Sequence, residues 1–116
     1  MKRKEMIERM LRRLGVPVHI KGYDYLVDAI SLMCDDDTYK SAITKKLYPD
    51  IAKKNKTTSS RVERAIRHAI EVGMKRADNE YLEEIFSYSY SSERGKPTNA
   101  EYIACLSREL ELKLNE

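Results

Sequence analysis

The chain has 116 residues, of which 41% are hydrophobic and 35% are charged. This length fits a single domain, the charge excludes a membrane-spanning chain, and the apolar share excludes a disordered one. The basic N-terminus leads into a charged amphipathic stretch with no long apolar run, so we expect no secretory signal and a cytoplasmic location. Cys34 and Cys105 lie far apart in the chain and are expected to be buried free thiols.

Apolar residues recur three and four positions apart, which predicts an all-α fold, a compact bundle of about six helices. The first helix is expected over Arg3–Leu14 with Gly15 capping its end, and the second over Gly22–Cys34. The aspartates at 35–37 lack the glycine and distal glutamate of a calcium loop, so no metal site is expected. Instead, Asp37 or Thr38 is expected to cap the next helix.

Four further helices follow in the second part of the chain. A helix over Tyr39–Lys54 contains Pro49, so it is either kinked there or divided, with Pro49 first in the second piece. Helices over Thr58–Met74 and Asp78–Phe86 come next, followed by a polar, tyrosine-bearing loop at 87–92. In the last helix, over Thr98–Asn115, the sequence from residue 98 to residue 101 is a capping box.

The charge is unevenly distributed along the chain. Residues 1–39 are neutral overall, whereas residues 40–76 carry eleven Lys/Arg against three Asp/Glu, a net charge of +8. Residues 77–116 carry four against nine, a net charge of −5. A basic segment within a nearly neutral protein is the pattern expected of a polyanion-binding surface, although a solvated lysine-rich face is the plainer alternative.

Residues 49–74 have the layout of a helix-turn-helix: a short helix, a tight polar turn and a longer amphipathic helix. On the second helix, five residues share the inward face: Val62, Ile66, Ala69, Ile70 and Gly73. The outward face carries Ser60, Arg64, Arg67, His68 and Glu71, with Arg61 and Glu63 at its borders. Such a helix can enter the major groove of DNA.

The residue types on this helix suit groove reading. Arginine can donate two hydrogen bonds to guanine, a carboxylate can accept from cytosine, and lysines and hydroxyls can hold phosphates. Two alternatives remain open here: Ser60 and Glu63 could form a capping box, and Arg67 could simply pair with Glu71.

The chain also resembles a known family. The runs that carry the resemblance are His19–Tyr23, Leu47–Lys54, Ser60–Val72 and Lys96–Asn99. They closely resemble the C-terminal DNA-binding domain of the master sporulation response regulator of endospore-forming bacteria, over about residues 5–112.

The resemblance implies a six-helix effector domain that binds a short TGTCGAA-like element on double-stranded DNA, often as tandem or dimeric copies. It implies base reading by Glu63, Arg64 and Arg67. Backbone contacts are expected from Ser60, Arg61, His68, Lys53, Lys54, Lys56 and Thr58. A surface for the RNA polymerase sigma subunit is implied at Glu80, Glu83, Glu84 and Phe86.

The chain departs from the family pattern in two respects. The stretch at 76–86 is more acidic than its family counterpart, and 116 residues cannot hold a receiver domain together with the helical module, so the receiver is expected to be absent. Either an isolated domain or a free-standing relative would fit.

These observations favour a transcription regulator, with one domain over residues 1–116 and no catalytic residues, metal or cofactor. The alternative is a protein-interaction adaptor that contacts the sigma subunit and binds DNA weakly. An enzyme has least support, because His19 and His68 are the only histidines and neither has metal-ligand spacing.

Overall fold

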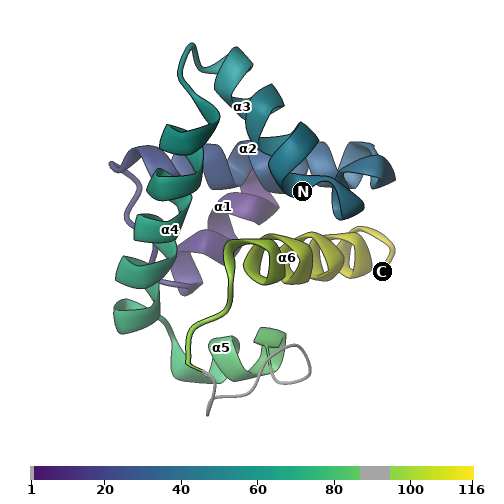
Figure 1. Cartoon of the computed structure of the whole chain (residues 1–116). Coiled ribbons are helices and arrows are strands. Elements are labelled where there is room, and N and C mark those ends of the chain that lie inside the picture. The colour runs from purple at the N-terminus through teal and green to yellow at the C-terminus, as the bar shows by residue number, and fades with distance from the viewer. Residues whose placement is uncertain (1, 87–94) are drawn as a thin grey trace.

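The computed structural model describes residues 2–86 and 95–116, and the all-α fold is confirmed for these residues (Figure 1). The predicted loop at 87–92 lies outside them. Two short segments, the 3₁₀ helix η1 (Asp37–Ser41) and the π-helix η2 (Ile43–Leu47), separate α2 from α3. The α-helices of the described residues are α1 (Arg3–Arg13), α2 (Lys21–Asp35), α3 (Tyr48–Lys54), α4 (Ser59–Arg76), α5 (Asn79–Phe86) and α6 (Asn99–Leu114).

The end of α1 follows the predicted glycine cap. Gly15 has a φ of 75°, and its N–H donates to Arg12 O at 3.0 Å. The N–H of Val16 donates to Leu11 O, also at 3.0 Å. This pair of bonds is a Schellman motif, which satisfies carbonyls that the helix end would otherwise leave unpaired.

The predicted helix over Tyr39–Lys54 is divided. Its first part forms η1 and η2, and α3 begins at Tyr48, so that Pro49 is the second residue of the last piece and not the first as predicted. The cap of η1 is Asp36, which accepts from Thr38 N at 2.9 Å, so the prediction of Asp37 or Thr38 as the cap was wrong. Lys46 also bonds Asp36, at 3.1 Å. The Thr38 hydroxyl also donates to Asp36, at 2.7 Å, and this bond, followed by those from Thr38 N and Lys46, lowers the pKa of Asp36 to about 2.

The core is built around α2, which is buried along most of its length between α1, α4 and α6. Fully buried apolar side chains from all six helices form one continuous cluster. The crossing of α2 and α4 is especially close: a Cβ on Gly22 would lie 2.2 Å from Ala65 O and 2.6 Å from Ala69 Cβ. A glycine is therefore required for the helices to approach at this point.

The predicted capping box of α6 is present. Thr98 Oγ1 accepts from Glu101 N at 3.1 Å, and the Glu101 carboxylate accepts from Thr98 N at 2.9 Å. Along the helix, Tyr102 stacks on Phe86 with ring centroids 5.3 Å apart, which joins α6 to α5.

The predicted burial of Cys34 and Cys105 was wrong, because each side chain is only half-buried at the edge of the core. None of the helices among the described residues is long and apolar enough to cross a membrane.

Candidate nucleic-acid interface

The helix-turn-helix consists of α3, a turn at 55–58 and α4, which stand along one side of the molecule in Figure 1. From α3, Ile51 and Ala52 are buried. The buried residues of α4 are the five predicted for its inward face: Val62, Ile66, Ala69, Ile70 and Gly73. The opposite side of α4 is therefore left for solvent or a ligand.

The turn depends on a residue in an unusual conformation. Lys56 has a φ of 54°, and it is the one non-glycine residue in this left-handed region among those the structure describes. Its N–H donates to Lys53 O at 3.4 Å, and Thr57 N donates to Ala52 O at 2.9 Å, which closes α3 with a second Schellman motif. This closure sets the direction in which the chain enters α4.

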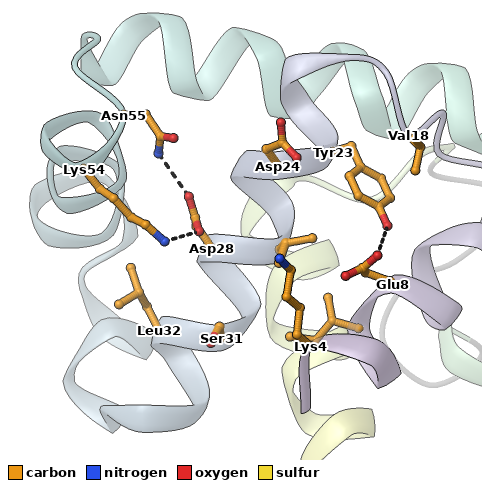
Figure 2. A pocket seen from close by; sticks show the side chains of 12 residues that line it. Lys4, Glu8, Val18, Tyr23, Asp24, Asp28, Ser31, Leu32, Lys54 and Asn55 are labelled. Atoms are coloured by element: carbon orange, nitrogen blue, oxygen red, sulfur yellow. Dashed lines mark hydrogen bonds and ion pairs between the residues drawn. The ribbon is translucent and has the colours of Figure 1, made fainter. Parts of the chain in front are cut away.

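A carboxylate on α2 anchors the same turn. Figure 2 shows Lys54 and Asn55 both pointing at Asp28, with Nζ at 2.7 Å and Nδ2 at 3.0 Å from its two oxygens. The side chain of Asp28 is only 14% exposed and lines a hollow of about 550 Å³ between α1, α2 and the end of α3. The charge of Lys54, predicted for a phosphate contact, is thus partly neutralised within the protein.

The start of α4 is not the capping box that the sequence left open as an alternative role for Ser60 and Glu63. The cap is Thr58, whose Oγ1 accepts from Arg61 N at 3.2 Å, and helix begins at Ser59. Ser60 is already inside the first turn, so the Ser60–Glu63 capping box is wrong. The carboxylate of Glu63 does not cap this helix and lies exposed on its surface.

The exposed residues of α4 form the candidate reading surface. Those in its first three turns combine two cations, a carboxylate, a hydroxyl and an imidazole: Arg61, Arg64, Glu63, Ser60 and His68. Lys53 at the end of α3 and Lys56 in the turn are exposed beside them. This arrangement is chemically suited to both base edges and phosphates.

Arg67 does not occupy the outward position that the helical pattern predicted. It is half-buried, and its Nη1 donates to Pro97 O at 2.9 Å. Its Nε and Nη2 are buried and have no hydrogen-bond partner among the described residues. The alternative pairing with Glu71 is not formed either; Glu71 lies 4.0 Å from Lys96 instead.

The residues predicted for a protein partner divide into two groups. Glu80, Glu83 and Glu84 are exposed on α5. Phe86 is 1% exposed and packs on Tyr102, so its placement on a partner surface was wrong. Phe86, at the end of a short amphipathic helix, fills the core together with Tyr81 of the same helix.

The sequence pattern missed one set of contacts with α4. Asn99 is 9% exposed, and its Nδ2 donates to Glu63 O at 3.1 Å. The sequence marked this region as the start of a helix and as one of the runs that carry the family resemblance, but not as a contact with α4. A buried asparagine next to a capping threonine was the available signal, but its partner is 36 residues away and cannot be read from spacing.

A comparison with protein families agrees with this geometry. The model described as "Sporulation initiation factor Spo0A C terminal" matches residues 7–110, which is nearly the whole chain. The matched region includes all of the helix-turn-helix and the segment that contacts it. That family is a DNA-binding regulator domain and not a known enzyme family. DNA is therefore the partner that the family supports, and the chain belongs to the family of Spo0A C-terminal domains.

Proposed function

We propose that this chain is a sequence-specific transcription regulator that reads a short TGTCGAA-like element with α4. The observation that supports the proposal is the exposure of Arg61, Glu63 and Arg64 together in the N-terminal half of a helix whose other face is buried. A recognition helix presents this half to base edges in the major groove. Arg64 is the candidate for a bidentate bond to guanine, and Glu63 for accepting from cytosine N4.

The surrounding groups would hold the DNA backbone. Lys53 and Lys56 lie exposed next to the reading surface, and within that surface Ser60, Arg61 and His68 flank the base-reading candidates Glu63 and Arg64. Thr58 is committed to capping, and Lys54 is paired with Asp28, so we expect weaker contributions from these two. Phosphate contacts of this kind add affinity for every sequence and make binding depend on salt.

A fluorescence anisotropy titration tests the proposal. The chain is titrated with a duplex carrying the element and with a scrambled duplex of equal length, each at two salt concentrations. We expect tighter binding to the element and a similar loss of affinity with salt for both duplexes. Equal affinity for the two duplexes would contradict sequence-specific reading.

The exposed acidic surface of α5 supports a second, compatible role. Glu80, Glu83 and Glu84 lie exposed on one short helix, outside the helix-turn-helix. We propose that this surface contacts the sigma subunit of RNA polymerase. Replacing the three glutamates by lysine should abolish transcription activation at a promoter with the element while DNA binding stays at least as tight. Unchanged activation would contradict this contact.

One reading helix covers only a short site, so we further propose that two copies bind adjacent elements. The last turn of α6 is available for a contact between copies, because Leu112 is 55% exposed and Leu114 is 42% exposed. Leu110 is fully buried and belongs to the core. On a duplex with two elements, Leu112→Ser with Leu114→Ser should reduce cooperative binding, and unchanged cooperativity would contradict a role for this turn.

A further inference from the structure

The segment Gly95–Asn99, here called the strap, runs beside α4 on its way into α6 (Figure 1). It contacts α4 at three positions spaced four residues apart. Asn99 bonds the carbonyl of Glu63, the carbonyl of Pro97 accepts from Arg67, and Lys96 approaches Glu71 at 4.0 Å. The strap and α4 run in opposite directions, so the strap follows α4 over two helical turns.

Arg67 is the central contact of the strap. Its guanidinium has one hydrogen bond, to the carbonyl of the buried Pro97, and two buried nitrogen atoms, Nε and Nη2, without a partner among the described residues. A cation buried in this way is unfavourable by itself and persists only where the surrounding structure holds it. The firm packing of Pro97 and Asn99 supplies that constraint.

The same geometry keeps Arg67 away from the reading surface. Arg64 lies one turn earlier and is exposed, whereas the Arg67 Nε and Nη2 atoms are covered by protein. These two atoms form one of the two edges that an arginine can offer to guanine or to a phosphate, and the other edge shares the buried Nη2 with Nη1, which bonds Pro97 O. In this conformation neither edge is available to DNA.

We propose that Arg67 is a positioning residue for DNA reading, and that it acts together with Asn99 through the strap. The two side chains fix the rotation of α4 and its distance from the start of α6, and thereby hold Glu63 and Arg64 at the angle the groove requires. Arg67 itself reads no base. This inference rests on the proposed function and extends it to residues that do not touch DNA.

The test compares variants on a panel of duplexes in which each base pair of the element is changed in turn. Arg67→Ala should weaken binding by roughly two- to thirtyfold on every duplex alike, so that the relative penalty of each base change is preserved. Asn99→Ala should weaken binding in the same uniform way. The double variant should lose little more affinity than whichever single variant binds DNA less tightly. Arg67→Lys, which retains one donor for Pro97 O, should recover part of the affinity.

Controls separate this role from others. Lys75→Ala, an exposed cation near the end of the same helix, should leave affinity within about twofold, and all variants are compared at equal folded fraction by circular dichroism. Loss of the penalty at one base pair in Arg67→Ala would show that Arg67 reads a base and would overturn the proposal. Full affinity in Asn99→Ala would overturn it as well.

NMR spectroscopy tests the positioning role of Arg67 without depending on a change in DNA affinity. In the ¹⁵N-labelled chain, the Arg67 Nε–H resonance should be shifted by Asn99→Ala and should keep its position when the element is added. A large shift on adding the element would contradict the positioning role. If the wild-type chain shows no preference for the element, the proposed function itself is contradicted. If the wild type prefers the element but Arg67→Ala changes the relative penalties of the base changes, only the positioning role is contradicted.

Discussion

Single residues on the reading surface differ in what they can recognise. Arg64 is exposed in the second turn of α4, whereas Lys53 is exposed at the end of α3. Arginine donates in a fixed fork that matches guanine, but lysine behaves as a point charge towards phosphate. Replacing Arg64 and replacing Lys53 should therefore affect DNA binding in different ways.

We predict that Arg64→Ala costs about 1–3 kcal/mol on the element and relaxes the preference at one base pair. Lys53→Ala should weaken all sequences alike and reduce the salt dependence by about one phosphate contact. Anisotropy titrations on element and scrambled duplexes at several salt concentrations measure both effects. Equal losses on every duplex for Arg64→Ala would exclude its role in base reading.

Lys56 illustrates a conflict between local conformation and residue type. Its φ of 54° is costly for a residue with a Cβ, by about 1–2 kcal/mol. Lys56→Gly should therefore raise the free energy of unfolding by up to about 1 kcal/mol, since glycine's larger unfolded-state entropy offsets part of the gain. Urea denaturation measures the change.

The matched control at this position is Lys56→Ala. It removes the same charge but retains a Cβ, so its stability should stay close to that of the wild type. Both variants should lose a similar amount of DNA affinity if Lys56 contacts a phosphate. A glycine variant no more stable than the alanine variant would show that the turn is not strained.

At the scale of elements, the position of α4 is determined by its neighbours more than by its own sequence. Gly22 allows α2 to approach it, Thr58 begins it, and the strap holds its middle turns. The periodicity of α4 predicted its buried face correctly. It did not predict the rotation of Arg67 out of solvent, because the strap is distant in sequence.

The close helix crossing leads to a stability prediction. In Gly22→Ala the added Cβ would lie 2.2 Å from a backbone oxygen, so the two helices must separate. We expect a loss of roughly 3 kcal/mol, the upper part of the usual range for overpacking. Thermal and urea unfolding measure it, with Lys21→Ala, an exposed neighbour, as the control. A loss similar to that of the control would contradict a tight crossing.

In the segment between α2 and α3, the structure differs from the helix that the sequence pattern predicts. A helix was predicted over Tyr39–Lys54, but α-helix begins only at Tyr48. Asp36, Thr38 and Lys46 bond one another across the preceding segment. Side-chain hydrogen bonds of this kind compete with helical backbone bonds and favour tighter or looser turns, which periodicity alone does not reveal.

The whole molecule should respond to alkaline pH through its tyrosines. The hydrogen bond to Asp50 raises the pKa of Tyr39 to about 12, and burial raises the pKa of Tyr81 to about 12. Folding therefore favours the protonated phenols. Their contribution to stability is complete below pH 10, the ordinary value, and is lost as the pH rises through about 12.

We predict that the free energy of unfolding falls between pH 10 and about 12, and that the fall is smaller in Tyr39→Phe with Tyr81→Phe. Urea denaturation at a series of pH values provides the comparison. Other groups titrate in the same window, but they are common to both proteins. An identical decline in the double variant would contradict the shifted pKa values.

The sequence by itself determined the fold class, the existence of six helices, the buried stripe of α4 and the basic segment that coincides with it. These features depend on periodicity, capping residues and charge, all of which are local along the chain. The family likewise follows from runs of neighbouring residues. For the same reason, Arg64 and Glu63 could be predicted as exposed candidates without a structure.

Only the tertiary structure decided which candidates remain available to a partner. It paired Lys54 with Asp28, buried Phe86 against Tyr102 and turned Arg67 towards Pro97. Each of these contacts joins residues at least 16 positions apart. Because a helical wheel describes one helix in isolation, it cannot show a neighbour that covers part of the outward face, and such a neighbour is what separates a reading residue from a positioning one.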